Sequence, residues 1–367
     1  MKKSKLFKVI ALLLVAIIGL TSCGNGGGSN ETTKEETSKL EENTSGQEDV
    51  STKDPSTIKI GMITDVGGVN DGSFNQSSWE GLQRAGEELK VTVKYLESKN
   101  DSDYTPNIET FVDEKYDLII CVGYMLADAM REAATNYPDQ KFAIIDDTSC
   151  SDLPNVTCLM FEQAESAYLA GVIAGLATES NKVGFVLGMS SEVMNQFGYG
   201  YIAGVKDTNP DSEVLQYNAN SFADAAAGKS AVTSMVTDGA DVIFHAAGGT
   251  GSGVIEGCVE NNIWAIGVDT DQSKLAPNNM LTSALKRVDN ACYDIAESVL
   301  NNTLESGVKT YNLSSEGVDI VSSSEHLTDE MKAAVEKAKA DIIAGKIKVP
   351  STKEAFNEKY GDIYDLD

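Results

Sequence analysis

The chain has 367 residues, 41% hydrophobic and 23% charged, which is enough for a packed core in more than one domain. A formal net charge of −27 repels the phosphates of nucleic acids and the headgroups of anionic lipids, so nucleic-acid binding is excluded. The six cysteines include no C-x-x-C pair and the only histidines are His245 and His326, which excludes zinc clusters and haem attachment, so we predict no metal site.

The first 22 residues have the pattern of a secretory signal peptide. Lysines come first, and Val9–Leu20 is then free of charge but too short for a comfortable membrane span. Leu20-Thr21-Ser22-Cys23 follows and resembles the lipobox of bacterial lipoproteins, in which Cys23 would become the lipidated first residue. The two acyl chains of a diacylglyceryl group suffice for stable anchoring, so we expect attachment to the extracytoplasmic face of the cell membrane.

Residues 23–57 are predicted to be an acidic, disordered tether behind this anchor. Gly, Ser, Thr, Asn, Glu and Lys dominate the segment, and such a composition cannot bury enough apolar surface to order itself. As a flexible coil it would reach roughly 30–35 Å. We therefore expect a folded body held outside the cytoplasm.

From residue 58 onward, strand patterns alternate with helical patterns in two successive series. Helical spacing is clear in Phe74–Lys90, and a long helix is predicted at Glu162–Thr178 between the two series. Alternation of this kind predicts parallel sheets built from right-handed βαβ units, one in each of two lobes. The predicted strands are Ile58–Asp65, Val91–Leu96, Tyr116–Gly123, Lys141–Asp146 and Val156–Phe161, then Lys182–Gly188, Glu213–Ala219, Asp241–Ala247 and Trp264–Asp269.

The last quarter of the chain returns to both lobes. A strand at Asn279–Arg287, a helix at Val288–Ser306 and a strand at Gly317–Val321 are predicted, and Thr328 caps a final helix that ends at Gly345. The predicted division is 58–161 with about 285–321 for the N-terminal lobe, and 162–284 with about 322–367 for the C-terminal lobe.

The carboxyl ends of the predicted strands carry acids and glycines. In open parallel sheets, ligands bind beyond these ends. Glycine allows close backbone approach, and a carboxylate accepts hydrogen bonds from hydroxyls or amines. Single residues of this kind are typical of turns, but six in one chain favour a binding site. The six strand ends are Asp65, Gly123-Tyr124, Asp146-Asp147, Gly188, Ala247-Gly248-Gly249 and Asp269.

Residues Asp65 to Gly81 closely resemble the opening signature of the basic membrane protein family. Its members are purine nucleoside receptor lipoproteins that serve ABC importers. Further segments match in order, so that the resemblance covers residues 58 to 350. They are Phe142–Asp146, Pro154–Val156, Tyr168–Gly171, Gly200–Val205, Ser221–Asp224, Gly239–Ile243, Ile266–Gln272 and Leu281–Lys286.

The resemblance implies a type I periplasmic-binding-protein fold, in which two Rossmann-like lobes joined by a three-strand hinge close over a nucleoside. By motif, Phe74 and Phe222 would stack on the base and Asp146 would contact its edge, although Asp147 is an alternative for that contact. The remaining implied ligand contacts are Asp269 and Lys286 with the ribose, Gly249 through its backbone, and Asp65 and Asn75 in the same cleft. It also implies permease and ATPase partners, and we expect a monomer that is not an enzyme and has no cofactor.

The scarcity of arginine supports a neutral ligand independently. The chain has three arginines, whereas phosphate and carboxylate sites usually recruit arginine or several cations. Lys286 is the main cation among the candidate residues. The sequence therefore favours a neutral polyhydroxyl ligand with an aromatic face and disfavours nucleotides.

Rival functions find weaker support. Gly228-Lys229-Ser230 resembles the end of a P-loop but lies within a predicted helix, and the Gly248–Gly253 loop lacks the dinucleotide-binding spacing. A hydrolase needs a base, but His245 lies in an apolar strand, where we expect it to be a core residue, and no G-x-S-x-G motif occurs. A sugar-binding or sensor-type receptor of the same fold remains an alternative, and so does a carboxylate-based hydrolase. The sequence does not distinguish a purine from a pyrimidine base in the ligand. Cys150 and Cys158 could pair in a disulfide.

Overall fold

The computed structural model describes residues 54–366 of the chain. The predicted signal peptide, the lipidation site Cys23 and most of the predicted tether lie outside the described residues. Within the described part, no helix combines the length and the apolar character needed to cross a membrane.

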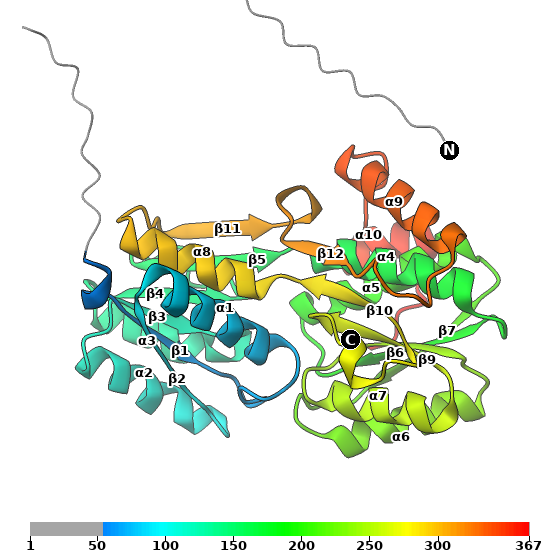
Figure 1. The fold of residues 1–367 in the computed structure, drawn as a ribbon, viewed down its shortest axis with the longest axis horizontal. Coiled ribbons are helices and arrows are strands. Elements are labelled where there is room, and N and C mark those ends of the chain that lie inside the picture. Colours follow the sequence, from blue (N-terminus) through cyan, green and yellow to red (C-terminus); the bar gives the residue numbers. More distant parts are fainter. Residues whose placement is uncertain (1–53, 367) are drawn as a thin grey trace, which may run out of the picture. The chain divides into compact units, whose positions relative to one another are not determined.

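The first sheet has six strands, all parallel, in the order β11-β5-β4-β3-β1-β2. Helices pack on both of its faces (Figure 1). One face, with Ile60, Met62 and Ile120, packs against α1 and α8, and the other, with Ile63, Ile119 and Phe142, packs against α2 and α3. The strands are β1 (Lys59–Ile63), β2 (Thr92–Leu96), β3 (Leu118–Cys121), β4 (Lys141–Ile145), β5 (Val156–Phe161) and β11 (Gly307–Tyr311), and the helices are α1 (Phe74–Leu89), α2 (Tyr104–Asp113), α3 (Ala127–Asn136) and α8 (Val288–Leu300).

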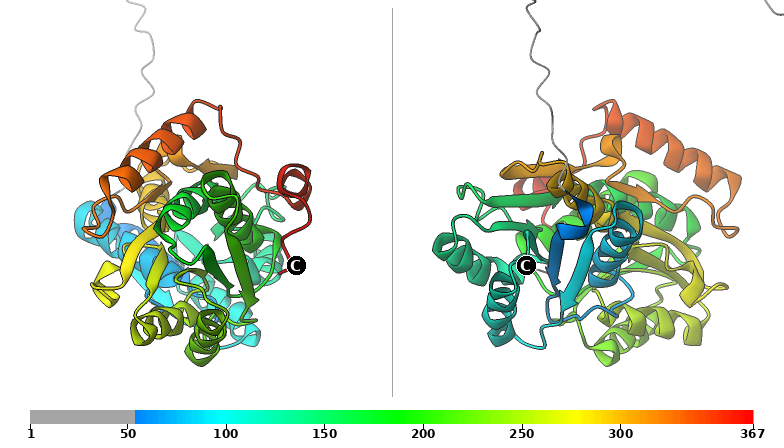
Figure 2. Two further views of the ribbon diagram at one scale, coloured as in Figure 1. Left: turned by 90° about the vertical axis from the view of Figure 1, so that its right-hand side faces the viewer. Right: turned by 60° about the vertical axis from the view of Figure 1, so that its left-hand side comes forward.

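The second sheet repeats this order as β12-β10-β9-β8-β6-β7, with only β12 antiparallel to its neighbour. Its strands are β6 (Lys182–Leu187), β7 (Glu213–Asn218), β8 (Val242–Ala246), β9 (Trp264–Asp269), β10 (Met280–Lys286) and β12 (Val318–Ile320). Helices α4 (Gln163–Ala177) and α5 (Glu192–Thr208) cover one face, and α6 (Ala225–Thr237) and α7 (Thr250–Asn261) cover the other. The last helices, α9 (Asp329–Ile343) and α10 (Lys353–Tyr360), pack on α4 and α5 (Figure 2).

The chain passes between the two sheets three times within the described residues, after β5, after β10 and after β11. These passages are tied to one another by backbone hydrogen bonds. Glu162 N–H donates to Tyr311 O at 2.8 Å, and Arg287 N–H donates to Gly317 O at 2.9 Å. The predicted three-strand connection is therefore present, and its short segments allow rotation of the lobes with few dihedral changes.

The structure differs from the predicted elements in the last quarter of the chain. Helix α8 ends at Leu300 instead of Ser306, because Asn302 adopts a left-handed conformation (φ 54°) that stops the helix. The exposed edge strand β11 and helix α10 were not predicted. Residues up to about 321 were predicted to belong to the N-terminal lobe, but β12 pairs with β10 in the second sheet, because the chain crosses after Tyr311.

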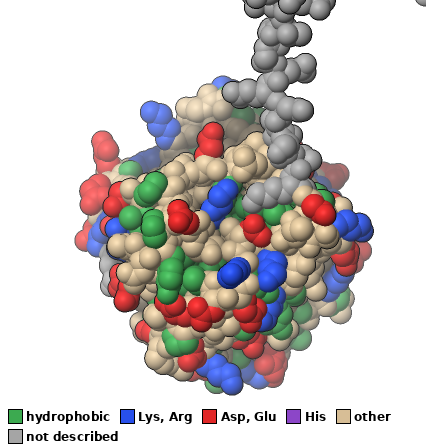
Figure 3. All heavy atoms as spheres, turned by 90° about the vertical axis from the view of Figure 1, so that its left-hand side faces the viewer, with side chains coloured by type: hydrophobic (Ala, Val, Ile, Leu, Met, Phe, Trp, Pro, Cys, Tyr) green, Lys and Arg blue, Asp and Glu red, His purple; other side chains and the backbone are tan. Residues whose placement is uncertain are grey.

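The cysteines of the described part are free and buried. Cys150 and Cys158 form no disulfide. Charge is dispersed on the outer face of the first lobe, where acidic and basic side chains alternate with apolar ones (Figure 3).

Candidate functional site

A cavity lies where the carboxyl ends of the two sheets face each other. It is lined by residues that follow strands β1, β3 and β4 of the first lobe and β8, β9 and β10 of the second. Among the predicted site residues, seven line it, namely Asp65, Phe74, Asn75, Asp146, Phe222, Asp269 and Lys286. The rest of its lining is Gly67, Asp71, Gly123, Tyr124, Met194, Phe197, Ala246, Ala247, Gly248 and Val268.

Two aromatic rings enter the cavity from opposite lobes. Phe74 is the first residue of α1, and its ring lies close to Gly123, where an added Cβ would be 3.5 Å from Phe74 Cε1. Phe222 lies in the loop between β7 and α6, and a Cβ at Gly188 would be only 2.5 Å from its ring. Gly188 therefore makes room for the ring of Phe222, whereas a Cβ at Gly123 would make only an ordinary van der Waals contact with Phe74.

The loop before α1 is held by a carboxylate that also faces the cavity. Asp71 accepts hydrogen bonds from the backbone N–H groups of Ser73 at 2.9 Å, Asn75 at 2.8 Å and Gln76 at 3.0 Å, so it caps the helix. The Asn75 side-chain amide donates to Asp71 at 3.0 Å and to Asp65 at 2.8 Å. This network fixes the position of Phe74, which lies between the capped residues.

Lys286 and Asp146 form a buried ion pair between the lobes. Lys286 ends β10 and its side chain is 1% exposed, and its ammonium donates to Asp146 Oδ2 beyond the end of β4. Three aromatic rings surround the ammonium, with centroids 5.2 Å (Phe74), 5.3 Å (Phe161) and 5.6 Å (Phe197) away. The second carboxylate oxygen, Oδ1 of Asp146, is buried and has no hydrogen-bond partner in the described structure.

Asp146 and Asp269 occupy equivalent places in the two lobes. Each stands at the carboxyl end of the third strand of its sheet in the order given above, Asp146 directly after β4 and Asp269 as the last residue of β9, and each has a φ of 65°, in the left-handed region. Asp and Asn tolerate this conformation better than other non-glycine residues. The repeated geometry turns one carboxylate from each lobe into the cavity.

Burial changes the protonation of two of the cavity carboxyls. It raises the pKa of Asp269 from 3.8 to about 7, and Asp71 and Asp146 add to the rise, while Lys286 and Ser73 oppose it. Burial likewise raises the pKa of Asp65 to about 6, although the hydrogen bonds from Asn75 and Gly67 oppose it. Each raised pKa means that the folded state favours the protonated carboxyl.

The contribution of Asp269 to the stability of the ligand-free protein is therefore expected to fall as the pH rises. Asp269 binds a proton more tightly in the folded chain than in the unfolded chain, so its stabilising contribution is complete below its unfolded pKa of about 4 and is lost as the pH rises through its folded pKa of about 7. At pH 8, Asp269→Asn is expected to raise the free energy of unfolding, on the order of 2–4 kcal/mol at about 1.4 kcal/mol per pKa unit. At pH 4 the two proteins should be alike.

Urea unfolding of the ligand-free protein at both pH values measures this difference. Asp341→Asn is the control of opposite sign, because Lys337 and Lys346 lower the pKa of Asp341 to about 2 and its loss should destabilise the protein at pH 8. A variant Asp269→Asn that is no more stable than the wild type at pH 8 contradicts the raised pKa.

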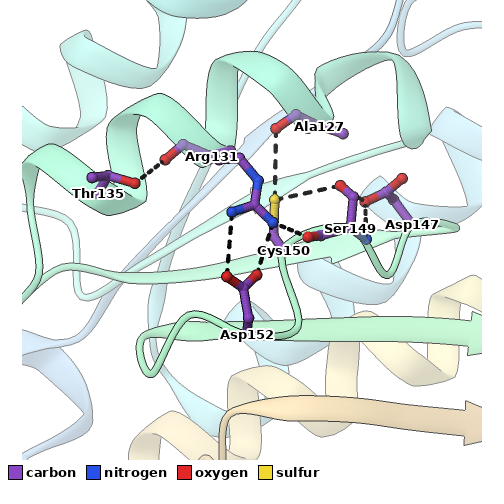
Figure 4. Close-up of polar contacts among 7 residues, drawn as sticks. All are labelled: Ala127, Arg131, Thr135, Asp147, Ser149, Cys150 and Asp152. Atoms are coloured by element: carbon purple, nitrogen blue, oxygen red, sulfur yellow. Dashed lines mark hydrogen bonds and ion pairs between the residues drawn. The ribbon is translucent and has the colours of Figure 1, made fainter.

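Two of the predicted positions, Gly249 and Asp147, do not line the cavity. The neighbour of Gly249, Gly248, whose φ of 52° lies in the left-handed region, lines the cavity instead. Asp147 points away, and its Oδ1 accepts from the Ser149 N–H at 2.8 Å in the turn that Arg131 and Asp152 brace (Figure 4). Of the two neighbouring aspartates, Asp146 is the one that reaches the cavity.

Several lining residues were not predicted to bind the ligand. Asp71 lies inside the Asp65–Gly81 motif, and Tyr124 belongs to the strand end Gly123-Tyr124, so both had a signal in the sequence. Phe197 and Met194 lie on α5, where an apolar residue is indistinguishable from a core residue. His245 is fully buried and burial lowers its pKa to about 4, which confirms it as a core residue. Gly228-Lys229-Ser230 lies within α6, as predicted.

Two α/β lobes that turn the carboxyl ends of their sheets toward a shared cavity define the class of the periplasmic-binding-protein-like proteins. A solute-binding protein of an ABC transporter system from Aeropyrum pernix K1 has the same fold, with a TM-score of 0.74 and 27% identity over 83% of this chain and 98% of that one.

The family model described as an ABC transporter substrate-binding protein, PnrA-like, matches residues 58–353. The chain therefore belongs to this family of substrate-binding proteins. It is 42% identical to the ABC transporter nucleoside-binding protein BmpA of Lactococcus lactis, over 80% of this chain and 89% of the relative. It is 38% identical to a CD4+ T-cell-stimulating antigen of Listeria innocua, over 95% of this chain and 99% of the relative.

Proposed function

We propose that this protein captures nucleosides, purine nucleosides in particular, between its two lobes and delivers them to an ABC importer. The observation that carries the proposal is the pairing of two aromatic rings from opposite lobes, Phe74 and Phe222, with a buried carboxylate oxygen, Asp146 Oδ1, that has no partner. A base between the rings would stack, and an N–H on its edge would satisfy that oxygen.

The charge of the cavity supports a neutral ligand that donates hydrogen bonds. Four buried carboxyls line it, while Lys286 is its only cation among the described residues, and Lys286 is already paired with Asp146. A phosphate would face this negative set without a free arginine or lysine to bind it. Ribose hydroxyls, in contrast, can donate hydrogen bonds to the Asp269 carboxylate of the second lobe.

The mature protein would be attached to the extracytoplasmic face of the cell membrane through a lipid on Cys23 and would act as a monomer. Delivery requires a permease and an ATPase, and the proposed role is binding without catalysis. The substrate-binding relatives support this role, and the name of the Lactococcus relative supports the nucleoside.

Isothermal titration of the protein, refolded to strip retained ligand, tests the proposal with guanosine, adenosine, uridine and ribose. Tight binding of purine nucleosides without turnover is expected. Binding of ribose alone would assign a sugar-binding role instead, and silence for all four would overturn the nucleoside. Product formation from a bound nucleoside would favour a hydrolase.

The ribose contact has its own test. Asp269→Ala is expected to weaken ribonucleosides by at least tenfold but free bases much less, because only the ribonucleosides carry the hydroxyls that donate to Asp269. Titrations of guanosine and guanine against both proteins measure the difference. Equal losses for the two ligands would refute the assignment.

A further inference from the structure

One residue of the Ile266–Gln272 motif segment, Gln272, has no role in the proposed binding of the ligand. Gln272 ends the Ile266–Gln272 segment, beyond β9, and its side chain is 4% exposed. It does not line the cavity, but it makes contacts with both lobes. Gln272 therefore contributes to the contact between the two lobes and not to the contact with the ligand.

The orientation of the Gln272 amide is determined by its neighbours. The backbone N–H of Val268, which can only donate, lies 3.0 Å from Oε1, so Oε1 accepts there. His245 Nε2 lies 3.2 Å from the same oxygen and therefore carries the proton. With Oε1 engaged twice, Gln272 Nε2 is left to donate to the carbonyl oxygen of Gly72 in the first lobe, at 2.9 Å.

The second lobe is built to hold this amide. A Cβ at Gly267 would lie 2.4 Å from Gln272 Oε1, and a Cβ at Gly251 would lie 2.2 Å from the His245 ring. Only glycine leaves room at both places. The backbone N–H of Gln272 also donates to Ser283 Oγ at 3.2 Å, which fixes the start of the side chain.

The acceptor in the first lobe is coupled to the ligand-facing residues. Gly72 adopts φ 66° between Asp71, which caps α1, and Ser73, whose hydroxyl donates to Asp269 Oδ2 of the second lobe. Phe74 follows directly. The neighbouring residues Gly72 and Ser73 are therefore both hydrogen-bonded to the Asp269–Gln272 segment of the second lobe.

We infer that Gln272, oriented by His245, is an interlobe latch that stabilises the closed form of the protein. The inference rests on the proposed function for its ligand, but the latch itself acts between the lobes. A ligand that binds the closed form has an apparent affinity set by the population of that form. Loss of the latch lowers affinity and speeds ligand release without altering the preference between bases.

Gln272→Glu tests the latch with the least change in shape. The carboxylate keeps an oxygen for Val268 and His245, loses the N–H that donates to Gly72, and places an oxygen against the Gly72 carbonyl. Affinity for guanosine is expected to fall about tenfold, mainly through faster dissociation, with an unchanged ratio of guanosine to adenosine affinity. Thermal melting checks that the variant folds.

Gln216→Glu is the matched control. Gln216 Nε2 also donates to a backbone carbonyl, that of Ile363 at 2.8 Å, and its Oε1 accepts from the Asp365 N–H at 3.3 Å, but both partners belong to the second lobe. Its guanosine affinity is expected to match the wild type. Adding His245→Phe to Gln272→Glu should cause little further loss, because His245 acts through Gln272.

A measurement without ligand separates failure of the latch from failure of the nucleoside assignment. Spin labels on Glu132→Cys in α3 and Val259→Cys in α7, one exposed position in each lobe, report the interlobe distance. Gln272→Glu should show a smaller closed population than the wild type and Gln216→Glu. Should the wild type bind no nucleoside, these populations alone decide. The latch would be overturned if Gln272→Glu and Gln216→Glu gave the same distribution of interlobe distances and, provided that guanosine binds, the same guanosine affinity.

Discussion

Lys286→Met is expected to lower the free energy of unfolding by about 3–5 kcal/mol, the cost of breaking a buried ion pair by removing one partner. The ammonium is 1% exposed and pairs with Asp146, while the other cavity carboxyls have no cation of their own to offset them. Methionine keeps most of the volume and the contacts with Phe74 and Phe161. The loss of stability therefore reports the charge and not a cavity.

Urea unfolding at pH 8 measures this effect, and two further variants interpret it. Lys337→Met removes an exposed lysine from its pair with Asp341 and should change the stability by less than about 1 kcal/mol. The double variant Lys286→Met/Asp146→Asn should regain much of the loss, because no unpaired carboxylate remains at position 146. A loss for Lys286→Met that is as small as for Lys337→Met would contradict the buried pair.

Phe74→Ala is expected to weaken guanosine binding by about 5- to 150-fold, which corresponds to the roughly 1–3 kcal/mol of a stacked base. The ring is only partly buried at the start of α1, so its removal should leave the fold intact. Phe222→Ala should act in the same direction from the opposite lobe. Calorimetric titration measures the affinities, and thermal melting checks the fold.

Tyr217→Ala serves as the control for the loss of an aromatic ring, because Tyr217 is 37% exposed on β7 and does not line the cavity. Phe74→Tyr keeps the π face and should bind nearly as the wild type does. Unchanged affinity in Phe74→Ala would remove Phe74 from the ligand site and leave it a packing role.

Local sequence patterns predicted much of the fold because most strands carry their own apolar run. β5 and β9 have the predicted bounds, and the alternation of strands and helices gave the two parallel-dominated sheets. The errors fall where local pattern and tertiary pairing separate. Gly307–Tyr311 is mostly exposed and carries little apolar signal, and only its pairing with β5 makes it a strand.

The candidate site divides in the same way. Asp65, Asp146 and Asp269 were predictable, because a strand end in a parallel sheet marks one edge of the fold. Phe197 was not, because its helix presents many buried residues and only the tertiary packing of the second lobe places that ring near Lys286 at the end of β10.

The sequence by itself determined the family, the two-lobed α/β architecture and the acidic, arginine-poor character of the cavity, since these follow from motifs, periodicity and composition. Only the tertiary structure decided that Asp146 and not Asp147 faces the cavity, that Lys286 pairs with it, and that Gln272 reaches Gly72. These contacts join residues about 140 to 200 positions apart, so no local pattern encodes them. They arise where the two sheets meet, and burial there fixes which polar atoms must pair.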